Sequence, residues 1–155
     1  MDSAHQMLIS LRLLKAYQRK HVSGIDCFKT WLISMNDQPV LSVTFFRTDA
    51  GRLPVQQWLK RLNKADRKVI GRDIHFVQFD WPLGMPLVRK IETYLWEVRS
   101  RLSSGRISRV LFTIRGKEMV LLHGFIKKSR RISQADLSLA RHRKNLCQSR
   151  RIVNE

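Results

Sequence analysis

The sequence has few of the residues on which several common classes of protein depend. Its only two cysteines, Cys27 and Cys147, lie far apart and match no metal-ligand spacing. Two free thiols are therefore expected, and the chain needs no oxidising compartment. Apolar runs are short, and none approaches the roughly 18 residues of a membrane-spanning helix. No membrane partner is expected.

Acidic residues are also scarce. The 155 residues include 12 Asp and Glu against 30 Lys and Arg, a formal net charge of +18. No cluster of carboxylates stands where it would hold a metal, so we expect no metal and no other cofactor. Such an excess of positive charge favours a polyanionic partner, because Lys and Arg release counterions from phosphates. An acidic protein partner and a basic surface that binds nothing are the alternatives.

One stretch, residues 95–131, organises the chain. It predicts three consecutive strands, Leu95–Arg101, Arg106–Arg115 and Glu118–Lys127, joined by turns at 103–105 and 115–117. Alternation sorts the side chains of these strands between two faces. The apolar face is expected to carry Trp96, Val98, Val110, Phe112, Ile114, Val120, Leu122, Gly124 and Ile126. Such a face requires a helix to cover it.

The opposite face carries an unusual group of basic residues. Pairing Trp96 with Phe112 across the first turn places Arg99 opposite Arg109, and a three-residue second turn places Arg109 opposite His123. Facing arginines repel each other unless an anion lies between them, so this row, with Lys127 at its edge, is suited to a phosphate. A two-residue second turn would instead shift the third strand and send His123 to the other face.

The remaining segments complete an α+β fold. A strand at 41–47 and two helices, 54–62 and 64–79, precede the sheet, and a helix from Ser133 to about Cys147 follows it. The expected order is βααβββα, a small antiparallel-rich sheet with two helices packed on one face. We expect residues 1–40 to be a dispensable extension, with a packed N-terminal helix as the alternative. The domain then spans 41–148, and 149–155 form a disordered basic tail.

Further basic residues gather before and after the predicted strands. They continue the positive charge of the row, which favours a groove for nucleic acid, although a solvated charged surface is the simpler interpretation. The candidate RNA-binding residues are Arg89, Lys90, Arg101, Lys128, Arg130, Arg131, Arg141 and Arg143.

Several segments together resemble the phage-derived branch of the RelE/HigB family, the toxins of bacterial type II toxin–antitoxin modules. The resemblance covers about residues 43–147. It rests on PVQQWLKRL (54–62), DWPLGMPLVRKI (80–91), LWEVRS (95–100), RISRVLFTIRGKEMVLLHGFIKKS (106–129) and LSLARHRK (137–144). The spacing and the turns match, as well as the composition.

This resemblance implies a microbial-ribonuclease-like α+β fold and ribosome-dependent cleavage of messenger RNA in the bacterial cytoplasm. It also implies a cognate helix-turn-helix antitoxin that silences the toxin. Carried over by position, the family's basic RNA-contacting and catalytic residues fall at Arg99, Arg109 and 123–128. The sequence departs from the family at 92–94, where relatives carry glycine-rich residues, so that loop is expected to differ in shape.

The residue types suit metal-free RNA cleavage, in which a 2′-hydroxyl attacks the adjacent phosphate. Arg99 and Arg109 are candidate donors to the phosphate. His123 is the candidate acid or base, with a structural sheet histidine as its alternative. Lys127 or Lys128 is a second candidate to hold the phosphate or carry a proton. Two other functions stay open: a ParE-like poison of DNA gyrase, and a basic nucleic-acid-binding module without catalysis.

Overall fold

The computed structural model of the chain describes residues 38–127 and 131–152. The chain divides into two units, Met1–Gln38 and Pro39–Glu155, and only the second is discussed below. Residues 1–37 of the predicted N-terminal extension lie outside the described residues.

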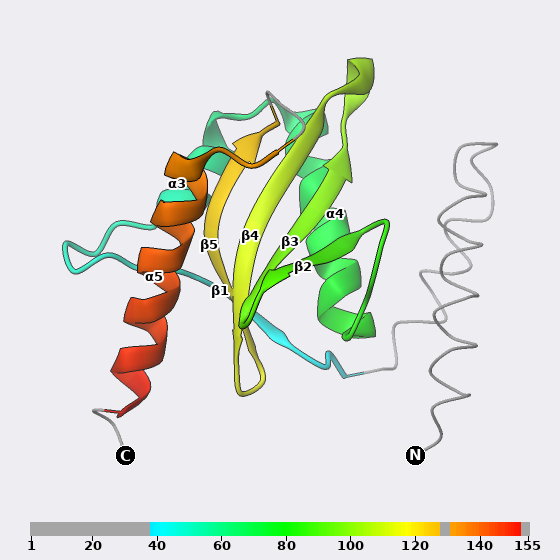
Figure 1. The fold of residues 1–155 in the computed structure, drawn as a ribbon. Coiled ribbons are helices and arrows are strands. Elements are labelled where there is room, and N and C mark those ends of the chain that lie inside the picture. Colours follow the sequence, from blue (N-terminus) through cyan, green and yellow to red (C-terminus); the bar gives the residue numbers. More distant parts are fainter. Residues whose placement is uncertain (1–37, 128–130, 153–155) are drawn as a thin grey trace. The chain divides into compact units, whose positions relative to one another are not determined.

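The second unit is a five-stranded sheet with helices on both of its faces (Figure 1). The strands lie in the order β1-β5-β4-β3-β2, and all neighbours are antiparallel except β1 and β5, which are parallel. The elements are β1 (Ser42–Phe45), α3 (Pro54–Arg61), α4 (Lys64–Asp80), β2 (Val88–Glu92), β3 (Leu95–Arg101), a short 3-10 turn (Ser103–Gly105), β4 (Ile107–Arg115), β5 (Glu118–Ile126) and α5 (Gln134–Ile152). The predicted α+β class is confirmed.

Strand β2 is absent from the predicted order. Its sequence, VRKIE, has three charged residues among five, and the prediction placed Arg89 and Lys90 as basic residues just ahead of the first strand of the sheet. A charged strand at the edge of a sheet is a common protection against pairing with other chains, and it leaves little hydrophobic signal in the sequence. The strand is closed by a tight turn in which Tyr94 adopts a positive φ of 57°.

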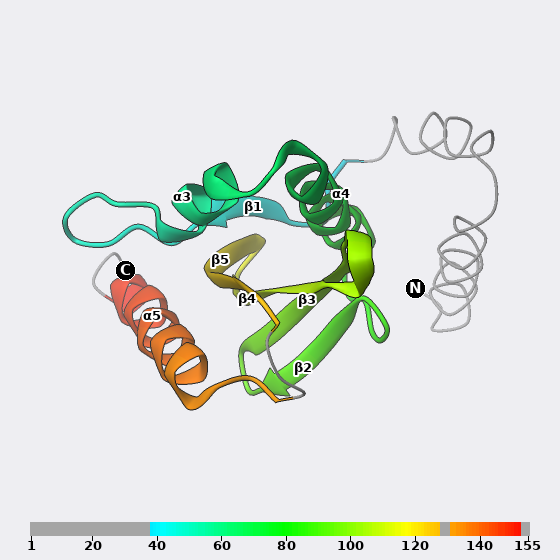
Figure 2. The same ribbon diagram turned by 90° about the horizontal axis from the view of Figure 1, so that it is seen from above.

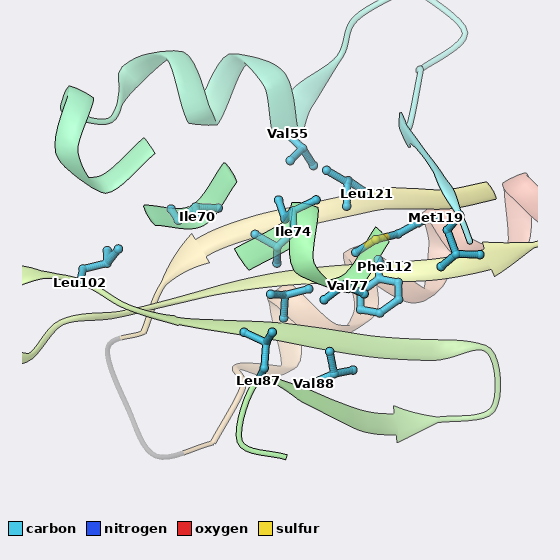
Figure 3. Packing of buried hydrophobic residues seen from close by; sticks show 13 residues of the cluster. Val55, Ile70, Ile74, Val77, Leu87, Val88, Leu102, Phe112, Met119 and Leu121 are labelled. Carbon is cyan, nitrogen blue, oxygen red and sulfur yellow. The ribbon is translucent and has the colours of Figure 1, made fainter. Parts of the chain in front are cut away.

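The main hydrophobic core lies between the sheet and the pair α3 and α4 (Figures 2 and 3). Pro54 starts α3 in its first turn, where the missing N–H costs no hydrogen bond, and Asn63 caps α4 by accepting a hydrogen bond from the Asp66 N–H. Phe112 lies at the centre of this core with no exposed surface. Figure 3 shows it among Val77 of α4 and Met119 of β5.

A second, smaller core lies on the opposite face under α5 (Figure 2). Leu95, Leu111 and Leu122 of the sheet contact Ala140 and Cys147 of the helix. The expectation of a single apolar face is therefore wrong, because α5 covers part of the face that was predicted to be polar. The basic row occupies only the part of this face that lies beyond the helix.

The strand register explains this difference. Between β3 and β4 the predicted pairing is confirmed, with Trp96 opposite Phe112 and Arg99 opposite Arg109. The second turn has two residues rather than three, since Arg115 pairs directly with Glu118.

Strand β5 therefore begins one residue out of the predicted register, and a β-bulge between the pairs Phe112–Leu121 and Leu111–His123 corrects it. Before the bulge, Met119 and Leu121 face the main core and Val120 faces α5, the reverse of the prediction. After the bulge, His123 returns to the predicted face. It lies opposite Leu111 rather than Arg109, whose partner is Phe125. The predicted pairing of His123 with Arg109 is therefore wrong, because the partner of His123 lies two residues further along β4.

Helix α5 continues to Ile152, past its predicted end near Cys147, and so includes the first residues of the predicted tail. Residues 153–155 lie outside the described part. Among the residues described, no helix combines the length and the apolar character that crossing a membrane requires.

Candidate nucleic-acid site

The centre of the site is a buried acid between two arginines. Arg99 on β3 and Arg109 on β4 are directly opposite each other, and Glu97, two residues before Arg99 on β3, lies on the same face. The Arg109 guanidinium lies 3.3 Å from one carboxylate oxygen of Glu97, and Nε of Arg99 lies 3.8 Å from the other. Glu97 therefore supplies the anion that a facing arginine pair requires.

Burial distinguishes these three side chains. Glu97 is fully buried and the Arg109 side chain is 3% exposed, whereas the Arg99 side chain is 26% exposed. Within the described residues, neither carboxylate oxygen of Glu97 accepts a hydrogen bond. Burial raises the pKa of Glu97 above its usual range, although Arg109, Arg99, Arg89 and Lys127 all act in the opposite direction.

Other cations surround this centre. Arg89 on β2 lies directly opposite Glu97 and is exposed, so it reaches solvent beside Arg99. Arg101 shares the face of Arg99 at the end of β3. The Lys127 backbone N–H donates to the Ile107 carbonyl over 2.7 Å, which fixes this residue just beyond β5. Of the cations in this region, Arg89, Arg99, Arg109 and Lys127 all act on the Glu97 carboxylate.

His123 is held by the C-terminal helix. Its Nε2 lies 2.7 Å from Oδ1 of Asp136, in the first turn of α5, and the His123 side chain is 19% exposed. The other Asp136 oxygen accepts a 2.5 Å hydrogen bond from the Ser133 hydroxyl, while the Asp136 backbone N–H donates to Ser133 Oγ over 3.1 Å. The hydrogen bonds between Ser133 and Asp136 at the start of α5 therefore lie next to His123.

Phe125 completes the row. It lies directly opposite Arg109, is only partly buried, and its ring stacks on His123 with centroids 5.4 Å apart. Sequence reasoning did not single it out, because a phenylalanine in a strand is usually part of a core. Its place among cations makes it a surface on which a base can stack.

Several predicted RNA-binding residues lie elsewhere. Lys90 is opposite Trp96 and so belongs to the other face of the sheet. Arg141 and Lys144 of α5 both bind Glu92, at 2.9 and 2.8 Å. Arg143 is partly buried and donates to the Leu122 carbonyl over 2.7 Å.

These contacts give Arg141 and Arg143 structural roles in holding α5 against the sheet. Arg143 also lies over the Phe46 ring, and burial lowers its pKa from the usual range. Arg131 is exposed just ahead of α5. Lys128 and Arg130 lie outside the described residues.

Two further features of the described residues lie apart from the row. No group of three or more His, Cys, Asp or Glu side chains in this part of the chain is arranged to hold a metal ion. A cavity of about 130 Å³ is lined by Phe45, Phe46, Arg47, Arg115, Val120 and Cys147, none of which was predicted as a site residue.

Comparison with known proteins identifies the family of the chain. A search of the curated proteins gives no match. The family model described as "Phage derived protein Gp49-like (DUF891)" matches residues 57–145, which is more than half of the chain and includes β2 to β5 and most of α5. The chain therefore belongs to the Gp49-like phage-derived family, a family of toxin–antitoxin toxins in the RelE/HigB-like group whose members act opposite an antitoxin.

Proposed function

We propose that this toxin is a ribosome-dependent endoribonuclease that cleaves messenger RNA without a metal ion and so arrests translation in the bacterial cytoplasm. The observation that carries the proposal is the arrangement on one sheet face of Arg99, Arg109, His123 and Lys127 around a single buried carboxylate. Its silencing partner is proposed to be a helix-turn-helix antitoxin.

The arginines suit the charge that develops during the reaction. When a 2′-oxygen attacks phosphorus, the phosphorane gains negative charge that must be stabilised by donors already in place. A guanidinium is permanently charged and presents a planar fork of N–H groups to phosphate oxygens. Arg99, the more exposed of the facing pair, reaches the phosphate, and buried Arg109 supports it from the next strand.

His123 and Lys127 suit the proton transfers. The 2′-hydroxyl must lose a proton to a base and the 5′-oxygen must gain one from an acid. An imidazole can accept a proton and later release it, and His123 lies on the same face as Arg109. Lys127 lies beyond the end of β5, on the other side of Arg109 along the strand direction. The two residues are therefore proposed as base and acid on either side of the phosphate.

The test is cleavage of a defined message on purified ribosomes, followed by analysis of the ends. The proposal expects cuts only on ribosome-bound RNA, cyclic phosphate and 5′-hydroxyl ends, and no loss of rate in EDTA. Arg99→Ala with Arg109→Ala should abolish cutting. Arg67→Ala, which removes an exposed charge from α4 on the other face, is the matched control and should cut normally.

Two results would redirect the proposal. Inhibition of DNA supercoiling by gyrase, with no cut message, would identify a ParE-like poison. Ribosome or RNA binding without cleavage would identify a non-catalytic basic module. A fully active double alanine variant would remove the arginine pair from the site.

A further inference from the structure

The Asp136–His123 contact is separate from the hydrogen bonds that cap α5. An ordinary cap is already complete within the helix, because the Asp136 N–H donates to Ser133 Oγ and the Leu137 N–H donates to the Ser133 carbonyl. Oδ2 of Asp136 accepts from the Ser133 hydroxyl. Oδ1 of Asp136 contacts Nε2 of His123, on a strand 13 residues away in sequence.

Helix α4 shows what a cap of the same kind looks like without a histidine. Asn63 and Asp66 repeat the spacing of Ser133 and Asp136, with Asp66 N–H donating to Asn63 Oδ1 over 2.8 Å and Asn63 Nδ2 donating to Asp66 Oδ2 over 2.8 Å. There Arg106 pairs with both carboxylate oxygens, at 3.1 Å from Oδ1 and 2.9 Å from Oδ2. The two helices therefore share a cap, but only α5 directs its carboxylate at a residue of the basic face.

We propose that Asp136 is a positioning residue that fixes the proton of neutral His123 on Nε2 and leaves Nδ1 as the proton acceptor. A carboxylate only accepts hydrogen bonds, so a neutral ring contacting it through Nε2 must carry its proton there. In the described part of the chain, Nδ1 of His123 has no hydrogen-bond partner. Stacking on Phe125 restrains the ring plane as well.

This inference rests on the proposed function and gives its base a defined atom. The 2′-hydroxyl proton passes to Nδ1 as the 2′-oxygen forms its bond to phosphorus. The bond from phosphorus to the 5′-oxygen breaks, and that oxygen takes a proton from Lys127. The resulting imidazolium is paired with Asp136 through Nε2, so the charge that develops on the ring is stabilised where it forms.

The experiment combines a measurement of the ring with a measurement of the rate. Long-range ¹H–¹⁵N NMR of His123 in the full chain, at a pH where the ring is neutral, should show the Nε2-protonated tautomer. Asp136→Asn should give a mixture of tautomers and reduce single-turnover cleavage about 10- to 100-fold, with ribosome affinity unchanged. Asp136→Glu should restore part of both.

Asp66→Asn is the matched control, since it neutralises the corresponding carboxylate of α4, which contacts Asn63 and Arg106, without touching His123. It should lower stability and leave the tautomer and the rate unchanged. A wild-type protein with mixed or Nδ1-protonated His123, or an Asp136→Asn variant that cuts at the full rate, would overturn the positioning role alone. A fixed tautomer in a wild-type protein that cuts no message would overturn the proposed function and the catalytic use of the pair with it.

Discussion

At the scale of single residues, Glu97 has the most unusual position in the molecule. It is a fully buried acid in a protein with an excess of basic residues, and it contacts two arginines without accepting a hydrogen bond within the described residues. The carboxylate keeps Arg99 and Arg109 together without an external anion. It also lowers the net charge that an incoming phosphate meets.

Replacing Glu97 by Gln should change how stability depends on pH. Burial raises the pKa of Glu97 in the folded protein above its ordinary value of about 4.5. The folded state therefore favours the protonated acid, and this contribution to stability is lost as pH rises through the raised pKa. Measured by thermal unfolding from pH 4 to pH 8, Glu97→Gln should gain stability relative to wild type as pH increases. A relative loss would contradict this sign.

His123→Gln should separate chemistry from folding. Loss of a general base costs roughly 10²- to 10⁴-fold in rate, whereas loss of one hydrogen bond to Asp136 costs only about 0.5–1.5 kcal/mol of stability. Single-turnover cleavage and unfolding by urea should be measured on the same sample. A normal rate with a large loss of stability would make His123 a structural residue and leave Lys127 as the proton carrier.

How much could be predicted from the sequence also differs from residue to residue. Arg99 and Arg109 could be paired from sequence because Trp96 and Phe112 fix the register of two strands joined by a short turn. The partnership of His123 with Asp136 could not, because it depends on how α5 docks against the sheet. The burial of Glu97 could not be predicted either, because the alternation of side chains shows which face of the sheet a residue lies on but not which elements cover that face.

At the scale of elements, α3 packs so closely on β5 that one position requires glycine. A Cβ atom added at Gly124 would lie 2.4 Å from two ring atoms of Trp58, a contact that real structures do not tolerate. Gly124→Ala should therefore displace the indole and cost about 1–3 kcal/mol, the usual range for overpacking. Unfolding by urea measures this cost, and Gly71→Ala on α4, with nothing near its added Cβ, is the control.

One carboxylate of β2 adds a charged contact to the packing of α5 on the sheet. Glu92, at the end of β2, accepts hydrogen bonds from Arg141 and Lys144, and these bonds lower its pKa in the folded protein. A lowered pKa contributes stability above about pH 4.5 that is lost as pH falls through the folded value.

Glu92→Gln should therefore destabilise the protein by about 1 kcal/mol at pH 7 and much less in acid. Thermal unfolding at pH 3 and pH 7 gives the comparison. An equal loss at both values would show that packing, rather than charge, makes the contribution. Glu92 stands in the segment where the sequence departs from its family resemblance, and β2 itself was not predicted, so this attachment had no sequence signal.

At the scale of the whole molecule, several of the few acidic residues pair with basic side chains. In the described part of the chain these include Asp66, Asp73, Glu92, Glu97, Glu118 and Asp136. The chain keeps a net charge of +18 despite these pairs. A protein of this kind binds polyanions readily, so the specific part of its activity must come from geometry at the site.

A shortened protein that begins at Met35 tests whether the N-terminal extension is dispensable. All of the described elements follow this position, and the family model begins at residue 57. We expect the shortened protein to unfold in one cooperative transition and to keep its effect on growth. Loss of several kcal/mol on truncation would show that the N-terminal residues form part of the folded core.

The β-bulge in β5 has a consequence for how this sequence can change over time. One extra residue, Leu122, interrupts the alternation of side chains along the strand. Odd-numbered residues therefore face the main core before the bulge and the opposite face after it. Substitutions can accumulate in either half independently. Changes in the length of β5 have to be absorbed at this bulge, because the turn fixes one end of the pairing and His123, opposite Leu111, fixes the other. Lineages of this toxin should therefore tolerate point changes in β5 and place changes in its length at the bulge.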